Sequence, residues 1–279
     1  MGLDTPYSEA AAAVLPVEYD GTASYRKGAA RGPQAILAAS CFLEQFDLDS
    51  EKEASQSIAT LPALSIKDST PPEQVPELVR AKVQPIFRDN KFPLVLGGEH
   101  SISVGSVAAA TEKFGRDLSI VHFDAHADLR EEFECTCFSH ACFLRRAREL
   151  NENTVSLGVR SLSKEEFDLI KQEKIPVFFK KDFSNARQLL DRIFPLLKER
   201  VYFSLDLDVL DPSEMPSVGT PEPGGMSFEE LVFLLEKIGK EKELIGADVV
   251  ELTPVENLEA PNFLAAKLCQ KIIGLAGQD

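Results

Sequence analysis

The sequence is poor in positive charge. Its 279 residues include 30 Lys and Arg against 45 Asp and Glu, which gives a formal net charge of −15. Nucleic-acid binders need clustered cations for phosphate contacts, and proteins that dock on anionic membranes need basic surfaces. We therefore expect neither a nucleic-acid partner nor a membrane partner, whereas cationic substrates and metal ions remain compatible with the acidic surplus.

Long apolar runs and paired cysteines are also missing. No stretch of about 18 apolar residues occurs, so no transmembrane helix is expected. The short apolar run at 10–16 has no basic segment before it, so no signal peptide is expected. The five cysteines are an odd number, and Cys135 and Cys137 lie too close together for an easy disulfide. The predicted location is therefore a reducing compartment, the cytoplasm.

Apolar runs alternate with helical segments after a proline-rich loop at 69–76, which leads into a helix. The predicted strands are 93–96, 118–123, 154–159, 175–179, 201–205 and 244–250. The predicted helices are 102–114, 140–150, 164–173, 186–200, 227–239 and 260–276. This alternation indicates βαβ units in a single α/β domain over 1–279 with a mostly parallel sheet, whose site lies beyond the carboxyl ends of the strands.

All four histidines lie in one window, between positions 100 and 140. His100 follows the strand 93–96 and two glycines, Gly97 and Gly98, which let the backbone turn sharply. This places His100 at the mouth of the sheet, although the residue alone also suits a helix N-terminus beside a serine cap.

Asp124, His126 and Asp128 follow the strand 118–123 at alternate positions. In an extended chain such residues point to one side, so the segment predicts half of a metal site. Solvated acids at a polar strand end are the alternative. His122 has the same parity but lies one step deeper, and we interpret it as packing behind the ligands.

Further acids follow two later strands. Asp206 and Asp208 are preceded and separated by apolar residues, and buried carboxylates repel one another unless a cation or proton lies between them. Asp211 precedes a proline and is expected to cap a turn. Glu251 ends the strand 244–250 and is suited to a guanidinium group, which pairs with a carboxylate in a bidentate geometry; a loop acid is the alternative.

The two histidines and four aspartates of these clusters offer too many ligands for one catalytic zinc with an open position. Carboxylates with imidazole favour Mn²⁺ over copper or structural zinc. Two ions that share a bridging carboxylate generate hydroxide and stabilise an oxyanion, so hydrolysis is the predicted reaction class.

The motifs GGEHS at 97–101, DAHAD at 124–128 and SLDLDVLDP at 204–212 resemble those of the ureohydrolase family of arginases and agmatinases. The resemblance is nearly full length and closest to agmatinase. It implies one three-layer α/β/α domain, two Mn²⁺ ions and a homo-oligomer, either a trimer or a hexamer. The implied ligands are His100, Asp124, Asp128 and Asp206 for one ion and Asp124, His126, Asp206 and Asp208 for the other.

The resemblance also implies roles for individual residues. A metal-bridging hydroxide, oriented by Asp128, would attack the guanidinium carbon. Glu251 would bind the guanidinium group of a small cationic substrate. His140 would contact the substrate and shuttle a proton to the leaving amine.

The segment 131–140 stands where arginase has a loop that receives the α-amino and α-carboxylate groups of its substrate. Here it carries Glu131, Glu132 and Glu134, which favours a distal amine, although a solvated loop is equally compatible. Agmatine, cleaved to urea and putrescine, is the predicted substrate; N1-aminopropylagmatine, guanidinobutyrate and arginine are the alternatives. Cys135, Cys137 and Cys142 are expected to be small buried residues rather than nucleophiles.

The sequence fits three other functions less well. A dimetal phosphoesterase needs late histidines, and none follows His140. A deacetylase of the same fold binds one Zn²⁺, whereas the acids present here suit two metals. A metal-binding protein without turnover would be expected to lack one of the catalytic residues, and none is missing here.

Overall fold

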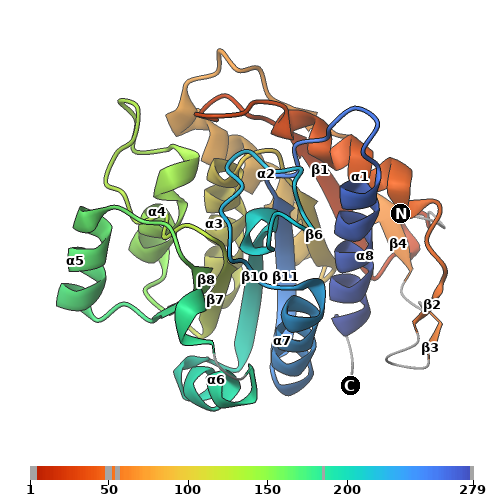
Figure 1. Ribbon diagram of the computed structural model, residues 1–279. Helices are drawn as coiled ribbons and strands as arrows, with labels where there is room; N and C mark the ends of the chain where they lie inside the picture. Colours follow the sequence, from red (N-terminus) through yellow and green to blue (C-terminus); the bar gives the residue numbers. More distant parts are fainter. Residues whose placement is uncertain (1–4, 48–51, 54–56, 184–185, 277–279) are drawn as a thin grey trace.

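A parallel β-sheet forms the centre of the protein (Figure 1). The computed structural model describes residues 5–47, 52–53, 57–183 and 186–276. The strand order is β4-β1-β6-β11-β10-β7-β8-β9, with β5 also paired to β1, and every pairing in this sheet is parallel. The strands are β1 Ala12–Glu18, β4 Ile58–Thr60, β5 Leu64–Ser65, β6 Phe92–Leu96, β7 Leu118–Phe123, β8 Thr154–Val159, β9 Val177–Phe179, β10 Arg200–Asp206 and β11 Glu243–Val250. A separate antiparallel pair joins β2 Phe46–Asp47 and β3 Lys52–Glu53.

Helices cover both faces of the sheet, because alternate strand residues bury into two distinct apolar clusters. One face packs against α1 Gly32–Ser40, α6 Ala186–Ile193, α7 Phe228–Glu241 and α8 Ala260–Leu275. The other packs against α2 Val75–Arg88, α3 Ser103–Phe114, α4 Phe143–Leu150 and α5 Lys164–Glu173. The predicted three-layer α/β/α fold with a parallel sheet is therefore confirmed.

Two predicted elements are too long, and proline explains both. The helix predicted over 186–200 ends at Ile193 and continues only as a 3-10 turn, Phe194–Leu196, because Pro195 has no N–H for a helical hydrogen bond. The strand predicted over 175–179 starts after Pro176, at Val177. Within the described part of the chain, no helix is both long and apolar enough to span a membrane.

Candidate metal centre

The four neighbouring strands β6, β11, β10 and β7 bring the predicted site residues to one edge of the sheet. His100 follows β6, Glu251 follows β11, and the DAHAD segment follows β7. Asp206 ends β10, and Asp208 lies in the 3-10 turn after it, where the Asp206 carboxylate accepts a hydrogen bond of 2.8 Å from the Asp208 backbone N–H. All six predicted ligands therefore come from the carboxyl ends of central strands.

The segment that leads to His100 packs closely against the backbone of Tyr19, just after β1. Gly98 lies so near β1 that a Cβ at this position would stand 1.7 Å from the Tyr19 carbonyl oxygen. The Gly98 carbonyl accepts a 2.7 Å hydrogen bond from the Glu251 backbone N–H. Only glycine permits this contact, and the contact holds His100 and Glu251 at adjacent strand ends.

The first cluster of ligands surrounds the buried ring of His100. Its Nδ1 lies 3.1 Å from Asp124 Oδ2, 3.2 Å from Asp206 Oδ2 and 3.4 Å from Asp128 Oδ2. Nδ1 nevertheless has no hydrogen-bond partner. A buried imidazole nitrogen that faces several carboxylates without a hydrogen bond has the geometry expected of a metal ligand.

The other nitrogen of His100 contacts a buried polar chain. Nε2 lies 2.9 Å from Ser204 Oγ, which donates a 2.7 Å hydrogen bond to Asp248 Oδ1. Since the Ser204 proton goes to Asp248, Oγ accepts from Nε2–H, and Nδ1 is the nitrogen left to face the carboxylates and to bind a metal. Ser103 and Tyr202 also donate to Asp248 and hold it in place.

The second cluster lies on the other side of Asp124. His126 Nδ1 is 2.8 Å from Asp208 Oδ2 and 3.5 Å from Asp124 Oδ1. Asp124 thus presents one oxygen to each histidine, as a bridging carboxylate does. Asp128 joins the first cluster through a left-handed backbone conformation, with φ of 49°, rather than through the simple alternation predicted for 124–128.

The charges of these clusters indicate a cation. Burial raises the pKa of Asp128 and Asp206 well above the usual value, and the neighbouring carboxylates of Asp124 and Asp208 raise it further. A divalent ion between the oxygens would relieve this repulsion. The oxygen-rich donor set with imidazole fits a hard or borderline divalent metal, and Mn²⁺ is among these.

His122 lies behind the clusters. Its Nε2 is 2.8 Å from Asp124 Oδ2 and its Nδ1 is 3.0 Å from Ser156 Oγ. Burial lowers the pKa of His122, so the ring is neutral and Nε2–H donates to the carboxylate. This hydrogen bond orients Asp124, in agreement with the packing role predicted for His122.

Glu251 points into the same pocket from a strained backbone, with φ of 70°. Its Oε1 accepts a 2.9 Å hydrogen bond from the His100 backbone N–H. Burial raises the pKa of Glu251 to about 7, an effect that Glu99 reinforces and His140 opposes. A cationic ligand would stabilise the charged carboxylate.

His140 lines the pocket beside Glu99, a buried acid for which the sequence suggested no role. Glu99 Oε2 lies 3.5 Å from His140 Nδ1, and Thr22 Oγ1 donates a 2.5 Å hydrogen bond to the same oxygen. Burial lowers the pKa of His140, but the contact with Glu99 and the charge of Glu251 outweigh it, so the pKa is raised. The place of Glu99 within the GGEHS motif, directly before His100, could have indicated a role for this acid.

A cavity of about 240 Å³ opens onto both clusters. Its polar wall includes Ser24, Arg130, Glu166 and Thr220, which the sequence did not suggest. The three glutamates of the 131–134 segment are not among its lining residues, and Glu131 instead pairs with Arg145 and Arg146. The expectation that these glutamates receive the distal end of a substrate therefore lacks structural support.

The cysteine expectation is partly wrong. Cys142 is buried, and burial raises its pKa to about 12, so its thiol is inert. Cys135 is exposed and Cys137 is intermediate, because the loop turns outward through a left-handed Cys135. All five cysteines are free, as expected for a chain without a disulfide framework.

Known proteins resemble this chain over nearly its full length. A sequence model of the arginase family matches residues 10–274. The N(1)-aminopropylagmatine ureohydrolase of Thermus thermophilus is 40% identical over 98% of this chain and 93% of its own length. The agmatinase of Pyrococcus horikoshii is 34% identical over 95% of this chain and 92% of its own. The crystal structure of the agmatine ureohydrolase of Thermoplasma volcanium superposes with a TM-score of 0.86 at 31% identity, covering 97% of this chain and 91% of that one.

Proposed function

This chain belongs to the arginase family, and from that premise we propose that it hydrolyses agmatine to urea and putrescine with two Mn²⁺ ions. It is a ureohydrolase, an enzyme that acts on guanidino C–N bonds. The observation that carries the proposal is the pair of His–Asp clusters around Asp124, next to a buried glutamate.

The proposed ligands divide between two ions. His100, Asp124, Asp128 and Asp206 would hold one, and Asp124, His126, Asp206 and Asp208 would hold the other. When bound, two such ions supply a water nucleophile at neutral pH and neutralise developing negative charge.

The remaining steps fall to side chains of the pocket. The Glu251 carboxylate would pair with the guanidinium group and fix its plane near the clusters. The Asp128 carboxylate would accept a hydrogen bond from the attacking water and orient it. His140, whose pKa the contact with Glu99 raises, would transfer a proton to the amine that leaves.

The pocket favours a cationic over a carboxylate substrate. Arg130 is the one Lys or Arg among its lining residues. The guanidinium group of Arg130 lies 5.1 Å above the Phe133 ring, and its Nε lies 4.0 Å from Glu166 Oε2, so Arg130 already has an acidic neighbour. The lining residues that could pair with a distal carboxylate, Arg130 and His140, each already lie beside a glutamate, whereas agmatine ends in an amine. N1-aminopropylagmatine shares that chemistry and is the second candidate.

A urea-release screen tests the substrate. Purified protein with added Mn²⁺ is assayed against agmatine, N1-aminopropylagmatine, arginine and guanidinobutyrate. Turnover of agmatine is expected, with arginine and guanidinobutyrate slow. Fast turnover of either carboxylate substrate without agmatine would overturn the substrate assignment, and bound Mn²⁺ without urea release from any of the four would indicate a non-catalytic metal-binding protein.

Asp208→Ala tests the metal assignment. The variant is expected to retain one ion per chain and to lose most of its activity, as measured by elemental analysis and urea release. Asp168→Ala, which removes an exposed acid on α5, is the matched control and is expected to keep both ions. Full activity of Asp208→Ala would refute the two-metal assignment.

A further inference from the structure

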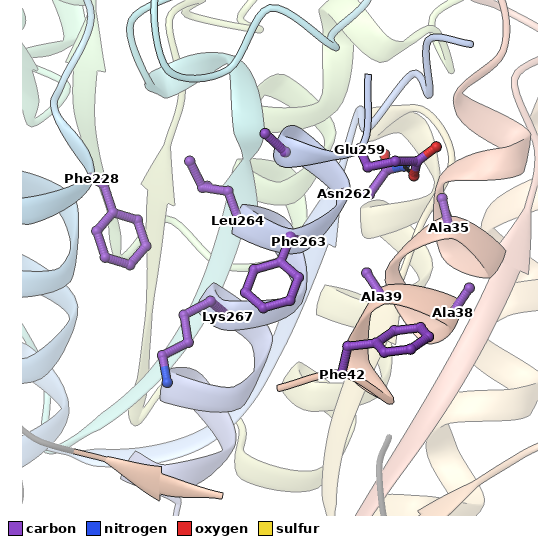
Figure 2. Close-up of a pocket in the computed structure, with 11 residues that line it drawn as sticks. Ala35, Ala38, Ala39, Phe42, Phe228, Glu259, Asn262, Phe263, Leu264 and Lys267 are labelled. Atoms are coloured by element: carbon purple, nitrogen blue, oxygen red, sulfur yellow. Dashed lines mark hydrogen bonds between the residues drawn. The ribbon is translucent and has the colours of Figure 1, made fainter. Parts of the chain in front are cut away.

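A hollow of about 1000 Å³ lies between α1, α8 and the start of α7 (Figure 2). Its wall is mostly apolar and it shares no lining residue with the metal pocket, so it adds no group to the chemistry of the candidate site. A further set of contacts to the metal pocket comes instead from the loop 20–26, which follows β1. Two residues of this loop, Thr22 and Ser24, contact His140.

Thr22 lies at the centre of these contacts. Its Oγ1 donates a 2.5 Å hydrogen bond to Glu99 Oε2 and accepts one of 3.1 Å from the His140 backbone N–H. A hydroxyl can do both, because it has one proton and two lone pairs. The Thr22 backbone N–H also donates to Glu99 Oε1, at 3.3 Å. One side chain thus connects the segment that carries His140 to an acid on the neighbouring β6 strand end.

Glu99 is a well-fixed anchor for this chain of hydrogen bonds. Its side chain is buried, and Ser101 Oγ donates a 2.8 Å hydrogen bond to its Oε1. Its backbone N–H donates a 2.9 Å hydrogen bond to the Tyr19 carbonyl, just after β1. A buried carboxylate with donors on both oxygens has little freedom to move, so it can hold Thr22 in one place.

The same contacts orient the imidazole of His140. Its Nδ1 lies 3.5 Å from both Glu99 Oε2 and Thr22 Oγ1, whereas its Nε2 lies 3.3 Å from Ser24 Oγ. The Phe133 ring packs edge-on against the imidazole, with ring centroids 5.8 Å apart. Because Ser24 lines the metal pocket, Nε2 is the nitrogen on the pocket side of the ring.

We propose that Thr22 is a positioning residue, which fixes His140 with Nε2 towards the pocket by connecting its main chain to Glu99. Thr22 is not among the residues that line the pocket, so it acts through His140. The inference rests on the proposed function, in which His140 gives a proton to the leaving amine.

Thr22→Val tests this role, because valine has the shape of threonine without its hydroxyl. With Mn²⁺-loaded protein and agmatine, kcat is expected to fall about 10–100-fold and KM to change by less than about twofold, because a misplaced general acid affects the chemical step rather than binding. Thr22→Ser keeps the hydroxyl and is expected to retain kcat within about threefold. Thr111→Val is the matched control: the Thr111 hydroxyl on α3 is buried without a hydrogen-bond partner, so its loss is expected to leave kcat unchanged.

A double variant separates positioning from a general loss of structure. His140→Ala removes the imidazole but keeps the backbone N–H that Thr22 accepts. In this background Thr22→Val is expected to lower kcat by less than about twofold, because residues that act through one another are not additive. An equal loss of kcat in both backgrounds would overturn the inference, as would a Thr22→Val variant as active as the wild type or a Thr22→Ser variant as slow as Thr22→Val.

Crystal structures of the Mn²⁺-loaded wild type and Thr22→Val test the positioning without turnover. In the variant, His140 Nε2 is expected to move by about 1 Å or more relative to Ser24 Oγ, a displacement large enough to impair catalysis. An imidazole in its wild-type place would overturn the inference, even where urea release supports the proposed function. A displaced imidazole in a protein that releases no urea would support the role of Thr22 in placing His140 and would count against the proposed function alone.

Discussion

At the scale of single residues, the tautomer of His100 depends on Ser204. Ser204 and Ser103 both donate to Asp248 Oδ1, at 2.7 and 2.9 Å, but Ser204 alone of the two also contacts the His100 ring. Ser204→Ala is therefore expected to weaken Mn²⁺ binding by about 10–100-fold, because the imidazole loses the acceptor that fixes its metal-facing nitrogen. Ser103→Ala is expected to have a much smaller effect.

Titration of the metal-free variants against a fluorescent chelator measures this difference. Equal losses of affinity in both variants would mean that Asp248 acts only by supporting the fold. The same titration of Asp248→Asn is expected to resemble Ser204→Ala, because the amide can present a donor to Ser204 and reverse its hydrogen bond.

Glu251 gives the candidate site a pH dependence. Its pKa is raised from 4.5 to about 7, so the carboxylate is charged above pH 7 and protonated below it. Only the charged form attracts a guanidinium ion, and kcat/KM reports the free enzyme. We expect kcat/KM for agmatine to fall as the pH drops through about 7, approaching tenfold per pH unit, with bound metal measured at each pH. A flat profile between pH 5.5 and 7 with both ions bound would contradict this role.

At the scale of elements, the sequence predicted the strands and helices after residue 92 because their periodicity is strong. It missed β1, which lies inside the sheet between β4 and β6. The β1 sequence is rich in alanine and contains Pro16, and both weaken the signal of a strand. Pro16 is tolerated near the carboxyl end of β1, where it lies opposite Leu96.

The clustering of the proposed ligands at one edge of the sheet could be predicted from their places just after strands, whereas whether they bind metal stays a prediction. The conformations that complete the site could not be predicted. Asp128 and Glu251 both have positive φ, which contacts distant in sequence impose. The Asp128 carbonyl accepts from Arg145 N–H, and the Glu251 N–H donates to Gly98. Asp248 could have been noticed in the sequence, because it is a single acid within an otherwise apolar strand.

Arg160 forms hydrogen bonds to the loops around Asp208. The Arg160 guanidinium, at the end of β8, donates hydrogen bonds of 2.7 Å to the carbonyls of both Asp208 and Glu222, and another of 3.2 Å to that of Leu210. Lysine cannot reproduce this planar set of donors. Arg160→Lys is expected to lower the free energy of unfolding by about 2–3 kcal/mol and to weaken metal binding at the Asp208 cluster.

Urea denaturation and metal titration check both effects. Arg200→Lys is the control, because Arg200 lies at the amino end of β10, where it pairs with Asp117 and Glu243 on the surface. That variant is expected to change the free energy of unfolding by less than about 1 kcal/mol. An Arg160→Lys variant that loses stability but binds both ions normally would show that the loops hold Asp208 without it.

At the scale of the whole molecule, the acidic surplus is only partly explained by the site. Taking the four ligand aspartates and Glu251 from the net charge of −15 leaves −10 on the rest of the chain. Two divalent ions would neutralise the four ligand aspartates, so the pocket itself need not be strongly negative when loaded. The remaining charge belongs to the rest of the chain and acts on any ion that approaches the protein.

The electric field of these acids is expected to attract a cationic substrate towards the protein. The dependence of the reaction on salt concentration tests this attraction. The distance over which charges act falls from about 30 Å at 10 mM ionic strength to about 10 Å at 0.1 M. We expect kcat/KM for agmatine to decrease several-fold over this range, because its local concentration at the pocket depends on the unscreened field. The inhibition constant of guanidinobutyrate, whose charges cancel, is expected to change much less, since both ligands share the guanidinium contact with Glu251. Equal salt dependence of the two would place the effect in that contact alone, and the remaining acids would then serve only to keep the protein in solution.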